Sequence, residues 1–167
     1  TLEAAASELA RRQGLSDAVA RLTVSRGPGA PGLEAPADPS PSVVLSLRER
    51  PAPPPSVVLT VVETPRRDPT SLNARAKMIG YADSIAARRR AKAEGADMAV
   101  MLDSAGRLSC ADCATLIWIE NGRAYTPALS CAAMPGTARA ALLEAARAAR
   151  VPILEAEAPG WRLESAA

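Results

Sequence analysis

The order of helical and strand-like patterns after Lys77 constrains the fold of this chain more than any other feature. In chain order the patterns are a helix to about Glu94, a buried-type strand at 98–102, strands at 114–119 and 123–126, a helix from Thr137 or Ala138 to about Arg150, and a strand at 151–155. Gly95 ends the first helix, and Glu120-Asn121-Gly122 is a strong hairpin signal. The sequence therefore predicts a mixed α/β (α+β) fold.

The part of the chain before Lys77 predicts a smaller unit. It begins with a helix at 1–13 that Gly14 caps, and strands follow at 20–27, 42–48 and 57–62. Residues 28–55 hold most of the 15 prolines, which favours loops and a linker over a proline-rich ligand motif. We therefore expect an N-terminal α/β domain at 1–66, a linker at 67–76 and a larger domain at 77–167.

Composition excludes several classes of protein. The net charge of +2 implies no general attraction to nucleic acid or membrane, and no stretch is long and apolar enough for a membrane span. The basic run Arg88-Arg89-Arg90 with Lys92 has two readings, a nucleic-acid patch or a solvated helix face. Because no aromatic residue interleaves with it, we expect the solvated face and no nucleic-acid partner. The start of the chain has no signal-peptide pattern, so we expect the cytoplasm.

The three cysteines and the absence of histidine limit metal and redox chemistry. Cys110-x-x-Cys113 has a spacing that suits a metal or a redox pair, but only Cys131 and Asp112 remain as further ligands. We therefore predict no metal site and no disulfide scaffold.

Lys77 and Tyr81 are the first candidates for chemistry. Lys77 stands just before an apolar helix, where its amine can face a cleft and act as a nucleophile or base. The alternative is a surface lysine whose stem covers Met78 and Ile79. Tyr81 is either a polar partner for Lys77 or a half-buried aromatic residue of the core. Lys92 lies nearby but falls on the polar side of the helix.

Gly136-Thr137-Ala138 opens the second helix of the larger part. A helix N-terminus presents free backbone N–H groups and the positive end of a dipole, which suits a phosphate. The alternative is an ordinary helix start with Thr137 as its N-cap.

Together these motifs resemble the fold-type IV pyridoxal-phosphate enzymes, the class IV aminotransferase family. The matching motifs are Lys77 shortly before Gly80-Tyr81, a helix ending in Gly95-Ala-Asp97, a strand ending in Leu102-Asp103, Gly122-x-x-x-Thr126-Pro127, and Pro135-Gly136-x-x-Arg139. The resemblance covers about residues 20–157. It implies that family's fold, with a small N-terminal domain and a larger cofactor domain, the first incomplete at its start and the second at its end.

The resemblance also implies roles for single residues. Lys77 would hold pyridoxal 5′-phosphate as a Schiff base, Tyr81 would hydrogen-bond its phenolic oxygen, and Gly136, Thr137 and Ala138 would grip its phosphate. Cys110 occupies the position of a glutamate that pairs with the ring nitrogen. Ala138 occupies the position of a threonine, and Pro31 that of an arginine with which some lyases reach a substrate carboxylate.

Within the family the 95–118 stretch is most similar to the aminodeoxychorismate lyases, which release pyruvate and form 4-aminobenzoate for folate biosynthesis. The resemblance implies an enzyme with a small-molecule substrate, and a homodimer. An aminotransferase acting on branched-chain or D-amino acids is the first alternative. A non-catalytic or truncated relative is the second, because Pro31, Cys110 and Ala138 all depart from the family at cofactor or substrate positions.

Overall fold

A computed structural model describes residues 1–165 of the chain. The chain divides into two compact units, the first at Thr1–Pro54 and the second from Pro55 onward. None of the helices within residues 1–165 is long and apolar enough to cross a membrane.

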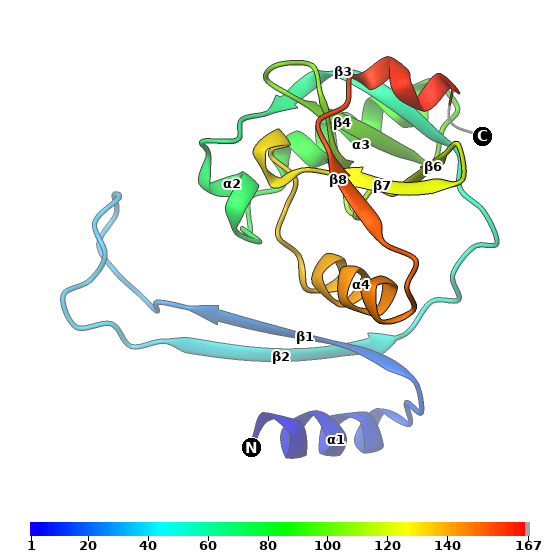
Figure 1. The fold of residues 1–167 in the computed structure, drawn as a ribbon. Helices are drawn as coiled ribbons and strands as arrows, with labels where there is room; N and C mark the ends of the chain where they lie inside the picture. Colours follow the sequence, from blue (N-terminus) through cyan, green and yellow to red (C-terminus); the bar gives the residue numbers. More distant parts are fainter. Residues whose placement is uncertain (166–167) are drawn as a thin grey trace. The chain divides into compact units, whose positions relative to one another are not determined.

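The first unit consists of a helix and a hairpin (Figure 1). Helix α1 (Leu2–Gln13) begins with the Thr1 side chain accepting the Ala4 N–H at 3.2 Å, and it ends at Gly14 in the left-handed conformation. Strands β1 (Ala18–Ser25) and β2 (Ser42–Glu49) pair antiparallel along their whole length. The helix with its Gly14 cap and both strands confirm the pattern predicted from the sequence.

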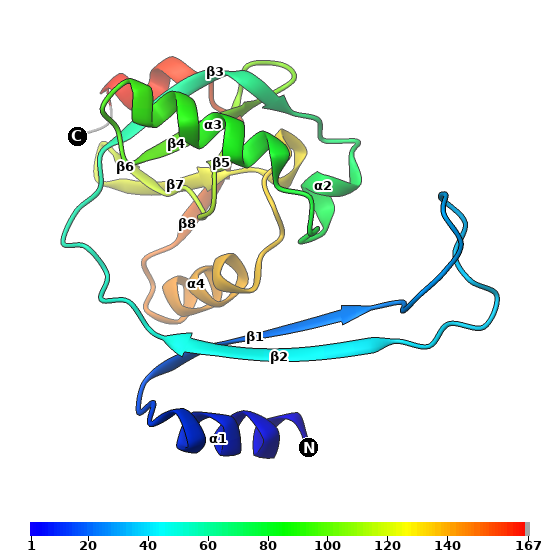
Figure 2. The same cartoon turned by 180° about the vertical axis from the view of Figure 1, so that it is seen from behind.

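The second unit is built around a sheet with the order β3–β4–β5. Strand β3 (Leu59–Arg67) runs parallel to β4 (Met98–Asp103), and β5 (Leu108–Ala111) runs antiparallel to β4. Helix α3 (Ala82–Ala93) covers one face of this sheet (Figure 2). Ala87 and Ala91 of the helix are fully buried against Ala99 and Met101 of β4. Alternate residues of β4 point to its other face, so the strand is apolar on both sides.

A second sheet, in the order β6–β7–β8, packs on that other face. Its strands are β6 (Trp118–Glu120), β7 (Arg123–Pro127) and β8 (Ile153–Ala156), with β6 and β7 antiparallel and β7 and β8 parallel. Val100 and Leu102 of β4 contact Leu116 and Trp118 in the shared core. Helix α4 (Thr137–Ala148) links β7 to β8, and short turns of 3₁₀ helix lie at η1 (Leu129–Cys131) and η2 (Gly160–Ser165).

The mixed α/β class and the hairpin at Asn121-Gly122 are confirmed, since both turn residues have positive φ (51° and 71°), as a tight two-residue turn requires. Other details differ from the expectation, and the strand expected at 114–119 begins only at Trp118. The first helix of the larger part begins at Ala82, after Tyr81, and not directly after Lys77. Strand β5 and helix α2 (Leu72–Arg75), which lies within the expected linker, were not predicted from the sequence.

A further point concerns β3. This strand was expected in the N-terminal domain, whereas it pairs with β4 in the second unit. The sequence of a single strand does not identify the strand it pairs with, because pairing in a sheet depends on residues far away in the chain. The expected domain ranges of 1–66, 67–76 and 77–167 stay a prediction.

Candidate active site

Lys77 and Tyr81 lie side by side at one wall of a cavity of about 600 Å³. The Lys77 Nζ donates a hydrogen bond of 2.6 Å to the Tyr81 hydroxyl and lies 5.2 Å from the centre of its ring. Ser71 is the N-cap of helix α2, where its Oγ accepts the Asn73 N–H, and Ala76 is the C-cap, in extended backbone. The short helix therefore delivers Lys77 to the cavity just before α3 begins.

The N-terminus of α4 forms another wall of the same cavity. Gly136 is the N-cap residue, with φ −75°, and no side chain caps the helix. The alternative in which Thr137 is the N-cap is therefore wrong, because Thr137 is the first residue of the helix. The amides of the first turn, which includes Thr137 and Ala138, are left without partners inside the helix, and they lie at the positive end of its dipole.

Arg139 fixes the start of α4 to the second sheet. Its guanidinium donates to the Pro127 carbonyl at 3.0 Å and pairs with Glu155 at 2.9 Å, although the side chain is 7% exposed. Its Nε is buried and has no hydrogen-bond partner among the described residues. Thr126, one residue before Pro127, donates its buried hydroxyl to the Leu116 carbonyl at 2.8 Å. The motif residues Thr126, Pro127 and Arg139 thus hold the helix start in place.

Cys110, the third residue of β5, is buried and lines the cavity. Burial raises the pKa of its thiol above the ordinary value, and the positive charge of Arg67 opposes this only in part. The residue is therefore a neutral thiol at pH 7. It can donate or accept only a weak hydrogen bond, and it cannot balance a positive charge as a carboxylate does.

The cysteines form neither a disulfide nor a metal site in the described part of the chain. Cys110, Cys113 and Cys131 are all free thiols. Within residues 1–165 no three or more histidine, cysteine, aspartate or glutamate side chains come together as a metal would require.

Asp112 and Arg88 form an ion pair that sequence reasoning missed. The Asp112 side chain is 1% exposed and accepts hydrogen bonds from the Arg88 Nε at 2.8 Å, from the Arg88 Nη2 and from the Ala99 N–H at 3.0 Å. Arg88 also donates to the Cys113 Sγ at 3.0 Å. The expectation that the basic run on α3 is wholly a solvated face was wrong for Arg88. No local pattern distinguishes Arg88 from its neighbours Arg89 and Arg90, because its partner lies 24 residues away.

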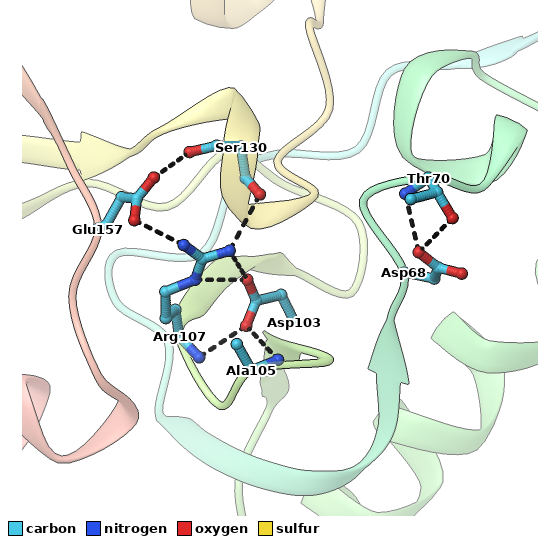
Figure 3. A network of polar contacts seen from close by, with 7 residues as sticks. All are labelled: Asp68, Thr70, Asp103, Ala105, Arg107, Ser130 and Glu157. Carbon is cyan, nitrogen blue, oxygen red and sulfur yellow. Dashed lines mark hydrogen bonds and ion pairs between the residues drawn. The ribbon is translucent and has the colours of Figure 1, made fainter.

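The loop between β7 and α4 is held from outside the cavity by the network in Figure 3. The Arg107 guanidinium donates to Asp103 at 2.7 Å and to the Ser130 carbonyl at 3.2 Å, and it pairs with Glu157. Asp103 is fully buried and also accepts the Ala105 and Arg107 backbone N–H groups. The turn after β4 is thereby tied to η1 and to the segment after β8.

The donors around the cavity suit one kind of ligand. They comprise a primary amine on Lys77, a phenol on Tyr81 and the uncapped amides at the start of α4. A cavity of about 600 Å³ is in the range of sites that bind a cofactor-sized molecule. In a ligand that carries both an aldehyde and a phosphate, the aldehyde could react with the Lys77 amine and the phosphate could bind at the N-terminus of α4. The residues present therefore fit pyridoxal 5′-phosphate.

Comparisons with solved structures show the same fold. A protein provisionally named 4-amino-4-deoxychorismate lyase, from Legionella pneumophila, is 24% identical, with a TM-score of 0.86 over 95% of this chain and 59% of its own. The branched-chain amino acid aminotransferase from Escherichia coli is 23% identical, with a TM-score of 0.87 over 99% of this chain and 55% of its own. A T.th. branched-chain amino acid aminotransferase with pyridoxamine 5′-phosphate is 24% identical, with a TM-score of 0.84 over 99% of this chain and 56% of its own.

The chain thus spans little more than half the length of these structures. No curated protein sequence matches it significantly. The profile of amino-transferase class IV, in contrast, matches residues 1–167. The chain therefore belongs to the class IV aminotransferase family of enzymes, whose cofactor is pyridoxal 5′-phosphate.

Proposed function

We propose that this chain carries the cofactor site of a pyridoxal-phosphate-dependent lyase that converts aminodeoxychorismate to 4-aminobenzoate and pyruvate, in folate biosynthesis. One observation supports the proposal above the others: Lys77, Tyr81 and the uncapped start of α4 line a single cavity. By the resemblance, Lys77 holds the cofactor, Tyr81 contacts its phenolic oxygen, and Gly136, Thr137 and Ala138 bind its phosphate through backbone amides.

When bound, the cofactor supplies a sink for the electrons of the substrate's broken Cα–H bond. Lys77 is the group that takes the α-proton, since a primary amine in its neutral form is a general base. Its hydrogen bond to the Tyr81 hydroxyl, 2.6 Å long, directs the lysine nitrogen within the cavity. Thr137 and Ala138 would have a different role, because amide N–H groups at a helix start can hold the cofactor's phosphate without a proton transfer.

Cys110 is the reason to prefer a lyase. A neutral thiol at the ring-nitrogen position makes the electron sink weaker than a carboxylate would. Elimination relies less on that sink than amino transfer does, because the leaving group departs with the electrons. Replacing a charge-paired hydrogen bond by a neutral one costs about 1.5–3 kcal/mol, or on the order of ten- to a hundredfold in rate.

A branched-chain or D-amino acid aminotransferase is the second candidate, since solved structures of similar fold include branched-chain aminotransferases. The full-length protein should be given aminodeoxychorismate in one assay and pairs of amino acids and keto acids in another. We expect 4-aminobenzoate and pyruvate in the first. Robust amino transfer in the second, with no 4-aminobenzoate in the first, would overturn the choice of lyase.

The assembly and the location belong to the same proposal. By the resemblance, the full-length protein would be a homodimer with a small molecule as its substrate, and the cytoplasm is its expected location. Light scattering on the purified protein tests the dimer. A non-catalytic relative is the remaining alternative, and a protein that shows no visible absorbance band at saturating pyridoxal 5′-phosphate would favour it.

A further inference from the structure

Arg67 lies at the last position of β3 and lines the cavity. Its backbone is fixed by the sheet, because its carbonyl accepts the Ser104 N–H at 2.9 Å and it pairs in register with Asp103. Its side chain is half-buried and leaves the strand toward two other segments. The end of β3 therefore carries a cation into the wall of the site.

The guanidinium of Arg67 donates to backbone carbonyls of both segments. Its Nε donates to the Ala132 carbonyl at 3.0 Å, and its Nη2 donates to the Asn73 carbonyl at 2.9 Å. Asn73 belongs to α2, and Lys77 follows shortly after that helix. Ala132 is the C-cap of η1, and Gly136 with the start of α4 follows shortly after it. One side chain thus joins the segment that carries the lysine to the segment that leads to the helix start.

We propose that Arg67 is a positioning residue that sets the span between the Lys77 amine and the N-terminus of α4. The inference rests on the proposed function, in which the first point holds the aldehyde end of the cofactor and the second holds its phosphate. Arg67 fixes this distance before the ligand binds. The two ends of one ligand can therefore bind at the same time. Such preorganisation raises affinity because it reduces the conformational entropy that the protein loses on binding.

The surroundings of Ala132 make the contact selective for arginine. Ala132 is fully buried and has a positive φ of 58°, so its carbonyl direction is set by an unusual backbone conformation. A buried carbonyl needs a donor, and Arg67 supplies it. The planar guanidinium offers two N–H groups in fixed directions, whereas a lysine ammonium is a point charge on a flexible stem. The network of Arg107 holds the same loop at Ser130, which precedes Ala132. The contact of Arg67 with Ala132 holds the loop closer to α4.

The test compares two ligands that differ only in the phosphate. Dissociation constants for pyridoxal 5′-phosphate and for pyridoxal are measured by absorbance titration of the full-length apoprotein, with Arg67→Ala, Arg67→Lys and Arg66→Ala beside the wild type. Arg66 is the matched control, because it is the neighbouring arginine but contacts Glu63 and does not line the cavity. Circular dichroism and thermal unfolding show which variants are folded.

We expect the wild type and Arg66→Ala to prefer the phosphorylated ligand equally. Arg67→Ala should lose about ten- to a hundredfold of that preference, while its affinity for pyridoxal stays within about twofold. Arg67→Lys, which keeps the charge, should lose at least about threefold of the preference, and it decides the matter if Arg67→Ala does not fold. An unchanged preference in a folded Arg67 variant would overturn the inference, and so would an equal loss of affinity for both ligands. A wild type that binds neither ligand would instead overturn the proposed function.

Discussion

Replacement of Asp112 by alanine should destabilise the second unit strongly. The carboxylate is 1% exposed and accepts three hydrogen bonds, two from Arg88 and one from the Ala99 N–H. Losing a hydrogen bond to a charged group costs about 1.5–3 kcal/mol, and leaving the fully buried Ala99 amide without an acceptor costs about 1–3 kcal/mol more. Arg88 adds little to this, because its side chain is 41% exposed and water can solvate the guanidinium. The expected loss in the free energy of unfolding is about 3–5 kcal/mol.

Urea denaturation followed by tryptophan fluorescence measures this loss, because Trp118 is buried in the core of the second unit. Lys92→Ala is the matched control on the same helix. It breaks an ion pair with Asp97 whose side chains are 57% and 47% exposed, so it should cost less than about 1 kcal/mol. An Asp112→Ala protein within about 1 kcal/mol of the wild type, or no less stable than Lys92→Ala, would refute the reasoning.

The remaining predictions concern acid stability and the cofactor site. Burial alone would raise the pKa of Asp112, but hydrogen bonds from Arg88 and from the Ala99 N–H outweigh it and lower the pKa. The stability that Asp112 contributes is therefore present above its unfolded pKa of about 3.9 and is lost as the pH falls through the lower folded value; urea titrations at several pH values should show less acid sensitivity in Asp112→Asn. Cys110→Glu should shift the absorbance band of the bound cofactor or its pH dependence, because a carboxylate favours a protonated ring nitrogen; an unchanged spectrum in loaded protein would place Cys110 away from the ring. Ala138→Thr should tighten the binding of pyridoxal 5′-phosphate by about two- to tenfold by adding a hydroxyl donor; equal affinity in an absorbance titration would mean that position 138 does not face the phosphate.

Local patterns were sufficient for much of the fold. Gly14 and Gly95 mark helix ends because each adopts a positive φ that other residues avoid, and Asn121-Gly122 fixes a hairpin by the same physics. The strand Met98–Asp103 could be recognised from its unbroken apolar run, which is typical of a strand buried on both faces.

Features that depend on distant parts of the chain could not be predicted in the same way. The pairing of β3 with β4 depends on residues far apart in the sequence, and Asp112, the partner of Arg88, follows only after strands β4 and β5. Arg67 illustrates the limit best. Its sequence neighbours suggest a linker, whereas its guanidinium reaches Ala132, 65 residues away. Local patterns indicated Lys77, Tyr81 and Gly136 and the family resemblance implied their roles, but the cavity that they share was not deducible from spacing alone.

The most direct test of the account is to identify the residue that bears the cofactor. The full-length protein is incubated with pyridoxal 5′-phosphate, reduced with borohydride and digested, and the labelled peptide is mapped by mass spectrometry. Lys92→Ala serves as the control, since Lys92 is the second lysine of the sequence and is paired with Asp97 on the surface. We predict that the label falls on Lys77, that it persists in Lys92→Ala, and that it is absent in Lys77→Ala. Label on Lys92, or no label on Lys77 at saturating cofactor, would contradict the assignment of this site.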